Sequence, residues 1–317
     1  MIDSICTSLL STFSIKIEPM SEVEDMQQWQ SAQAYVNLLG EIPSSFTIAA
    51  RALKTDSENG LKKMGDQTWF QIGRLLKSST VDAVLNGFIK TYKPFLPEVS
   101  SAEELARNIP PLDLASIIAS LFYHKRTKKL VDPEEWSYIL PFLARDIDVA
   151  VAVGLTIPNL GVAKSLMVIG GKYLALGPFQ MHDKKGFTEY RRYLKGRNFI
   201  FDPAWEISRW GCHTGHVTST MYQNFGLGIP AVDGLATGSA YPLEQSPKDK
   251  VEYPIWLISV WVKSLIDTGK QPDMPHKPAY FPDQEMVDLL ESFVGPLRTS
   301  ASGISKWLDA ASGELEG

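Results

Sequence analysis

The residue types best suited to chemistry lie close together in the second half of the chain. Cys212, His213 and His216 could supply thiolate and imidazole ligands within a small space, and Glu206 or Asp202 could add a carboxylate. A zinc or iron ion would still need one or two further ligands. The structural alternative is favoured, because a histidine at a helix start often bonds backbone groups and a cysteine often packs as a small buried side chain.

Other catalytic motifs are absent from the sequence. No GxSxG nucleophile motif occurs, and no GxGxxG motif follows a strand. The pair Gly171-Lys172 does not belong to a phosphate-binding P-loop, because Tyr173 follows it and Leu166 stands where the motif requires glycine. The two cysteines, Cys6 and Cys212, form neither a CxxC pair nor a disulfide framework, which favours a reduced, cytoplasmic setting.

Composition limits the classes of partner. The formal net charge of −5 argues against a general nucleic-acid binder, so we expect no DNA partner. The densest basic cluster, residues 124–129, includes Lys125 and Arg126, which are candidates for binding an anion or a protein partner. The alternative is a solvated helix end, where cations suit the helix dipole. No membrane segment is evident, and the start of the chain lacks the basic region of a signal peptide.

The element that must position these residues is a helix predicted over Gly161–Leu176. Its consecutive apolar residues, Leu166 to Ile169, cover every side of a helix, and this pattern is typical of a helix buried all round. We expect the glycine and proline at Gly177 and Pro178 to end it. It therefore forms the centre of a globular core.

The rest of the chain also indicates helices. Capping residues precede several amphipathic segments, as at Asp132 and Asp202, each of which is followed by proline. Pro141 should kink or split a helix. Sustained alternation of apolar and polar residues is missing, so strand evidence is weak and the fold class is all-α. Residues 283–294 and 302–311 are predicted as terminal helices.

The order of these segments resembles the HDOD domain, a degenerate relative of the HD-type metal phosphohydrolases found in bacterial signalling. The resemblance runs from about Leu38 to about Asp267. The segment from Ser165 to Lys172 resembles the family's "GLLHDIG.L" helix. Residues 206–230 resemble its "E...G..H..VG..L...W.LP" segment, and His216 takes the place of the histidine, with His213 as a weaker alternative.

Departures from the family pattern decide what the resemblance implies. Val168 and Ile169 stand where catalytic HD proteins place adjacent His and Asp ligands. Residues 136–145 contain no histidine, and residues 255–266 contain no acid. Only His216 remains, and one ligand cannot hold a catalytic metal. The resemblance therefore implies no metal, no cofactor, no catalytic residue and no phosphodiesterase activity.

The fold implied by the resemblance is a two-lobed multi-helical bundle. We expect an N-terminal extension over residues 1–32 and an N-terminal helical lobe over 33–130. A degenerate HD-like lobe follows over 131–270, and a linker with C-terminal helices occupies 271–317.

The implied function is that of a non-catalytic signalling or regulatory module that binds a protein partner, with a nucleotide as a further candidate ligand. Lys125, Arg126, Tyr190 and Tyr193 are the candidate partner-binding residues, and Trp256 is a further aromatic to test as a binding hot spot. One alternative is a metal-dependent phosphohydrolase with an atypical site around His213 and His216. Another is a small-ligand sensor whose pocket lies between the N-terminal helices and the later bundle.

Overall fold

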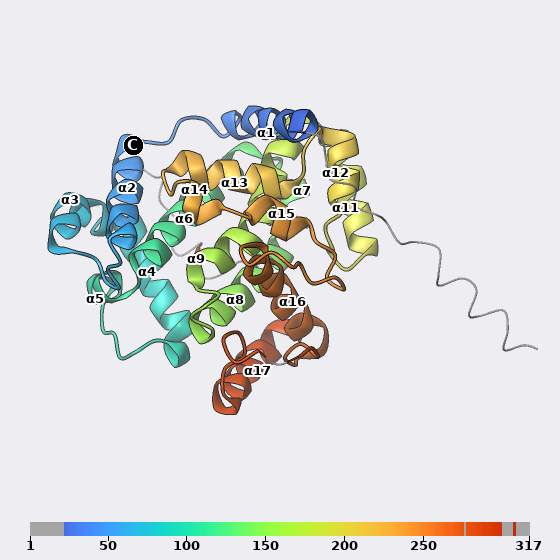
Figure 1. Cartoon of the computed structure of the whole chain (residues 1–317). Coiled ribbons are helices and arrows are strands. Elements are labelled where there is room, and N and C mark those ends of the chain that lie inside the picture. The colour runs from blue at the N-terminus through green and yellow to red at the C-terminus, as the bar shows by residue number, and fades with distance from the viewer. Residues whose placement is uncertain (1–21, 276, 300–306, 309–317) are drawn as a thin grey trace, which may run out of the picture.

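The chain folds into helices throughout the part that this computed structural model describes, residues 22–275, 277–299 and 307–308 (Figure 1). No β-strand occurs in these ranges, so the predicted all-α class is confirmed. The first half contains α1 (Glu22–Asn37), α2 (Ser44–Glu58), α3 (Asp66–Leu76), α4 (Ser79–Tyr92), η1 (Lys93–Phe95), α5 (Ala102–Asn108), α6 (Pro111–Leu130), α7 (Pro133–Ser137) and α8 (Leu140–Thr156). The second half contains α9 (Val162–Ser165), η2 (Leu166–Gly170), α10 (Gly171–His182), α11 (Lys184–Gly196), α12 (Pro203–Trp210), α13 (Thr214–Phe225), α14 (Ile229–Val232), α15 (Leu235–Ala240), α16 (Glu252–Thr268) and α17 (Gln284–Thr299).

The predicted central helix is one continuous segment through α9, η2 and α10, and η2 is a π-helical turn. Leu166, Met167 and Val168 are buried, which confirms the burial predicted from consecutive apolar residues. Helices α6, α8, α13 and α16 pack around this segment. At Gly171 a Cβ atom would clash with the side chain of Thr218 on α13, so glycine permits the close approach of these two helices.

The predicted end of the central helix at Gly177 and Pro178 is wrong, because α10 continues to His182 with the proline in its interior. A proline inside a helix removes a backbone hydrogen bond and costs about 3 kcal/mol. The next residue, Phe179, is fully buried and stacks on Trp210 with ring centroids 4.1 Å apart. Packing between distant segments therefore offsets the local cost of the proline.

The two helix starts predicted at Asp132 and Asp202 are confirmed by capping side chains. Each carboxylate accepts a hydrogen bond from a backbone N–H in the first turn of the helix that follows, and the Ser101 hydroxyl does the same at the start of α5. The split predicted at Pro141 is also confirmed, since α7 and α8 are separate and α8 begins at Leu140. These features are local, so a few residues determine them.

Buried apolar side chains form one continuous core that extends across the predicted lobe boundary at residues 130 and 131. Helix α2 packs on α6, and α6 in turn packs on α9 and α10. The N-terminal helices and the later bundle therefore share this core. The division of the chain into domains stays a prediction.

The segment predicted as a linker, residues 271–282, contacts the core where it is described. Phe281 is buried, and its ring lies 5.3 Å from that of Trp261 in α16. Helix α17 then confirms the helix predicted over residues 283–294. This part of the chain therefore packs on the bundle and does not extend away from it.

The last described residues, Trp307 and Leu308, are buried. The indole Nε1 of Trp307 donates hydrogen bonds to the Tyr92 hydroxyl at 2.9 Å and to the Asp148 carboxylate at 3.1 Å. The rest of the helix predicted over residues 302–311 lies outside the described residues, as does the N-terminal extension up to residue 21.

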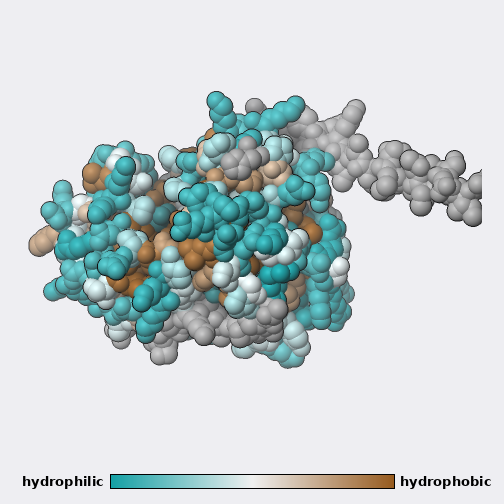
Figure 2. Space-filling view, turned by 90° about the horizontal axis from the view of Figure 1, so that it is seen from below, coloured by the Kyte–Doolittle hydropathy of each residue, from teal (hydrophilic) through white to brown (hydrophobic). Residues whose placement is uncertain are grey.

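The surface is mixed in character. The face shown in Figure 2 is mostly hydrophilic, with smaller hydrophobic patches between. Within the described ranges, none of the helices has the length and apolar character needed to cross a bilayer.

Candidate functional site

The residues singled out for chemistry meet beside the central helix. Glu206 comes from α12, His213 caps the start of α13, and His216 lies in the first turn of α13. Lys172 of α10 and Tyr190 of α11 complete the group, whose members influence one another electrostatically. We refer to Lys172, Tyr190, Glu206, His213 and His216 as the polar cluster. The structure thus brings Glu206, His213 and His216 together and adds a lysine and a tyrosine, whereas the Asp202 carboxylate binds Tyr193 and caps α12 instead.

Glu206 is fully buried, and both of its carboxylate oxygens are occupied. Oε1 accepts a hydrogen bond from the Tyr190 hydroxyl, and Oε2 accepts one from the Thr214 backbone N–H at 2.6 Å. Burial raises the pKa of Glu206 to about 7, although these hydrogen bonds and the positive charge of Lys172 lower it. The carboxyl group therefore joins α11 and α12 to the start of α13.

The two histidines face each other with ring centroids 4.0 Å apart. His213 Nδ1 accepts a hydrogen bond from the Gly215 N–H at 3.0 Å, so this nitrogen carries no proton. Burial lowers the pKa of His213 well below its usual value and lowers that of His216 to about 4. Both imidazoles are therefore neutral at neutral pH.

Helix α1 covers the outer side of His216. The ring of Trp29 meets the imidazole edge-on at 4.8 Å, and Asp25 Oδ1 lies 3.9 Å from its Nε2. His216 Nδ1 is buried and has no hydrogen-bond partner within the described part of the chain. This arrangement shields the imidazole from solvent and leaves one nitrogen without a partner.

Cys212 is not the thiolate that a metal site or a nucleophilic reaction would require, and Lys172 responds to burial and to the charge of Glu206. Burial lowers the pKa of Lys172 to about 8, although attraction to Glu206 raises it. Cys212 is fully buried, and burial raises the pKa of its thiol, with the charge of Glu206 adding to that effect. The cysteine therefore stays a thiol, whereas a metal ligand or a nucleophile is a thiolate.

The positions of these side chains do not form a metal site. Among the described residues, no group of three or more His, Cys, Asp or Glu side chains is arranged to hold a metal ion. Glu206 and His213 are already engaged with backbone groups, and Cys212 is protonated. The hydrogen bonds of Glu206 and His213 fix the turn between α12 and α13.

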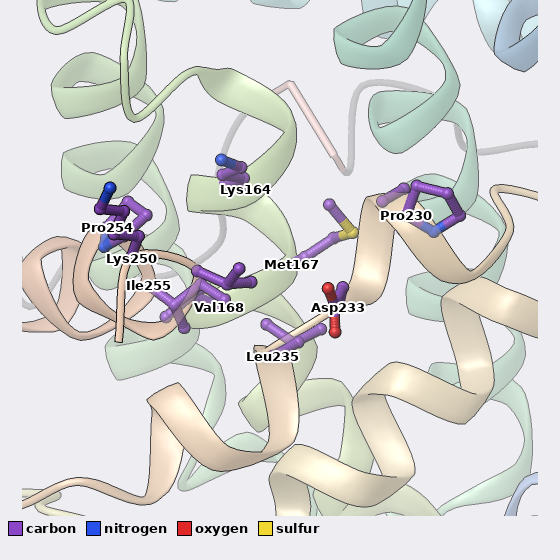
Figure 3. Close-up of a pocket in the computed structure, with 11 residues that line it drawn as sticks. Lys164, Met167, Val168, Pro230, Asp233, Leu235, Lys250, Pro254 and Ile255 are labelled. Atoms are coloured by element: carbon purple, nitrogen blue, oxygen red, sulfur yellow. The ribbon is translucent and has the colours of Figure 1, made fainter. Parts of the chain in front are cut away.

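Val168 and Ile169, the positions that correspond to HD metal ligands in the resemblance, are both buried. Val168 lies one helical turn before Lys172 and lines a cavity of about 250 Å³ between the central helix and helices α14 to α16 (Figure 3). A second cavity, of about 340 Å³, lies between residues 36–42, Tyr123 of α6 and Asn224 of α13. This second cavity lies where the N-terminal helices meet the later bundle, which is the location expected for the pocket of a ligand sensor.

Tyr190 and Trp256, two of the candidate partner-binding aromatic residues, are buried. Tyr190 is fully buried, since its ring stacks on Trp205 at 4.5 Å and its hydroxyl binds Glu206. Trp256 is also buried, and its Nε1 donates a hydrogen bond to the Pro242 carbonyl at 3.0 Å. Neither aromatic side chain is available to a partner without unfolding.

The other predicted partner-binding residues are engaged within the chain. Tyr193 is half-buried, and its hydroxyl binds the carboxylate of Asp202. Lys125 and Arg126 are also half-buried, and the Arg126 guanidinium donates to the Glu41 carbonyl at 3.2 Å. These residues therefore offer a smaller free surface than the sequence suggested.

The sequence interpretation missed an exposed basic surface on α11. Four of its side chains, those of Lys184, Lys185, Arg192 and Lys195, are exposed. The signal was present, because these positions fall on one side of a helix with 3.6 residues per turn. We refer to these four residues as the basic face.

Comparison with known proteins adds no relative: no family model, no curated protein and no solved structure matches the chain.

Proposed function

We propose that the chain is a non-catalytic regulatory module that binds an acidic surface of a partner protein through the basic face of α11. The observation that carries this proposal is the geometry of that face. At 100° per residue, its four cations fall within an arc of about 100° and extend over about 16 Å of helix. Within the described part of the chain, none of the four forms an ion pair.

The neighbouring cations behave differently. Arg191 pairs with Glu135 at 2.8 Å, and Arg209 pairs with Asp183 at 2.7 Å, so these charges are neutralised inside the chain. The opposite side of α11, with Phe187 and Leu194, is buried. The helix is thus anchored on one side and presents unpaired charge on the other, which is the arrangement expected of a docking surface.

The uneven distribution of charge over the chain favours a protein partner over a nucleic acid. Helix α11 carries five basic residues and one acidic residue, Glu189, whereas the whole chain has a net charge of −5. A long polyanion would be attracted to the basic face and repelled by the rest of the surface. A local acidic patch on a folded protein matches the face without that repulsion.

The polar cluster supports the non-catalytic part of the proposal. Its carboxylate and one imidazole are engaged in hydrogen bonds within the chain, and α1 covers the other imidazole. The resemblance to HDOD proteins adds the context of bacterial signal transduction, and the cysteine usage adds a cytoplasmic location. The nucleotide suggested by the same resemblance is a weaker candidate, since the basic face lies on a convex helix surface and not in a pocket.

The experiment compares two charge-reversed variants in affinity purification with quantitative mass spectrometry. The test variant changes Lys184, Lys185, Arg192 and Lys195 to Glu. The matched control makes the same change at four exposed cations of α2 to η1 that form no ion pair within the described ranges: Lys62, Arg74, Lys90 and Lys93. Both variants have the same net charge, so a difference between them reports the position of the charges.

We expect a partner that the wild type and the control retain and the test variant loses. Binding of the purified pair should weaken as salt is raised, because exposed charges are screened. A partner retained equally by the test variant, or a nucleic acid as the retained species, would contradict the proposal.

A further inference from the structure

We propose that the cavity between the central helix and helices α14 to α16 binds a small amphipathic monoanion, with a compact apolar body and one carboxylate. This lysine-rimmed cavity is separate from the basic face, so the inference goes beyond the proposed function and does not depend on it. Its walls, its rim and its size each limit the ligand (Figure 3).

The walls of the cavity are apolar. Met167 and Val168 contribute from η2, Leu235 from α15, and Ile255 from α16. Figure 3 shows these side chains gathered at the centre of the view, facing the space between three elements. Such walls stabilise an apolar group by removing its surface from water, and they offer no hydrogen bonds to a polar one.

Two lysines stand at the rim. Lys164 belongs to α9, one turn before Val168, and Lys250 lies just ahead of α16. Neither ammonium group forms an ion pair within the described part of the chain. Partial burial lowers the pKa of Lys164. A ligand carboxylate at the rim would supply the missing negative charge.

Asp233 restricts the ligand charge. It lies at the rim beside Leu235, on the other side of the cavity from Lys250 in Figure 3. With two lysines and one aspartate, the rim has a net charge of +1, which one carboxylate neutralises. A phosphate or a dicarboxylate would bring a second negative charge close to Asp233, and like charges at short distance repel.

The wall of the cavity on the α14–α15 side depends on a turn that only glycine readily forms. Gly234 has φ of 70°, the left-handed region, and a Cβ atom there would lie 2.8 Å from Val251 Cγ1. The turn between α14 and α15 can therefore pass close to the start of α16. The volume of about 250 Å³ is below the usual range for drug-sized ligands, so the apolar body is a single ring or a short branched chain.

The test uses methyl NMR of the full chain labelled at methionine methyl groups, with Met167 as the reporter. Its resonance is assigned with Met167→Leu. Benzoate and 4-methylpentanoate are the probes, benzamide is the uncharged match of benzoate, and phenyl phosphate is the dianion. The variants are Lys164→Gln and Lys250→Gln, which remove rim charge, and Ala231→Phe, which fills the cavity from its half-buried wall.

We expect both carboxylates to shift the Met167 resonance in a saturable manner. Benzamide and phenyl phosphate should bind at least about tenfold more weakly, and each Lys→Gln variant should lose about tenfold in affinity without a change in melting temperature. Ala231→Phe should abolish the shift, and the basic-face variant should keep it. No carboxylate-dependent shift at Met167, equal binding of benzamide, or a loss below about threefold in both lysine variants would overturn the inference.

Discussion

The central helix borders two regions of opposite character. Around Lys172 the side chains are ionisable and packed. Glu206 and His213 bond neighbouring groups, whereas His216 Nδ1 has no hydrogen-bond partner among the described residues. One turn earlier, around Val168, the side chains are apolar and leave a cavity with cations only at its rim. Residue types that could do chemistry therefore fill the closed region, while the open region is built from ordinary core residues.

This difference shows that a site needs both reactive residue types and access for a ligand, and that the first does not provide the second. Burying a carboxylate or an imidazole costs less when its polar atoms are hydrogen-bonded, as the Glu206 oxygens and His213 Nδ1 are. Satisfying them occupies the atoms that a ligand or metal would need. A binding site needs unfilled space and unpaired groups, and the cavity beside Val168 meets both conditions.

The largest effect is expected when a charge is placed in the apolar region. Val168→Asp would bury a carboxylate among apolar side chains, so we expect a loss of more than about 3 kcal/mol in the free energy of unfolding, or failure to fold. Val168→Leu is the control and should cost less than about 1.5 kcal/mol. Urea denaturation measures both, and near-native stability of the Asp variant would mean that Val168 is exposed.

The next largest effect is expected in the polar region. Glu206→Ala removes the acceptor of the Tyr190 hydroxyl and of the Thr214 N–H and leaves a void, so we expect a loss of about 2–5 kcal/mol. Glu189→Ala, at an exposed position, should change stability by less than about 0.5 kcal/mol. If the two variants unfolded at the same urea concentration, the polar cluster would have no structural role.

A smaller effect is expected in the pH dependence of stability, because the pKa of Glu206 is raised while those of the two histidines are lowered. The folded-state pKa of Glu206 is raised to about 7, so its contribution to stability falls as pH rises from about 4.5 to 7. That of His216 is lowered to about 4, so its contribution rises with pH between about 4 and 6.5, and His213 acts in the same direction. Lys172, Tyr190 and Asp25 are the ionisable neighbours of these groups.

In the wild type the falling contribution of Glu206 offsets only part of the rise from the two histidines, so stability should rise less steeply between pH 4.5 and 6.5 than it would without Glu206. Glu206→Gln keeps the shape of the side chain but cannot titrate, so its stability should rise with pH over this window. Thermal unfolding at several pH values measures both profiles. Parallel profiles would show that Glu206 does not titrate in this range.

A feature of the fold could be predicted from the sequence when neighbouring residues determine it, and could not when residues far apart in the sequence do. The caps at Asp132 and Asp202 follow from adjacent residues, and the burial of Leu166 to Ile169 follows from their sequence. The continuation of α10 past Pro178 depends on Phe179 stacking against Trp210, which no local pattern reveals. The sequence could therefore supply the fold class and the central helix but not the end of that helix.

The candidate site was predictable only in part for the same reason. The grouping of Glu206, His213 and His216 could be anticipated, because they are close in sequence. The burial of Tyr190 could not, because its partner Glu206 comes from another helix. The cavity could not be predicted either, since three separate segments of the chain must leave space between them.

The most direct test of the central claim is the metal content of the purified full chain. The claim is that the polar cluster is structural, whereas the alternative is a phosphohydrolase site around His213 and His216. Elemental analysis after purification without chelators should find less than about a tenth of an equivalent of Zn, Fe, Mn or Ni, because structural and catalytic sites retain their metals tightly. About one equivalent in the wild type that disappears in His213→Ala and His216→Ala would contradict the account.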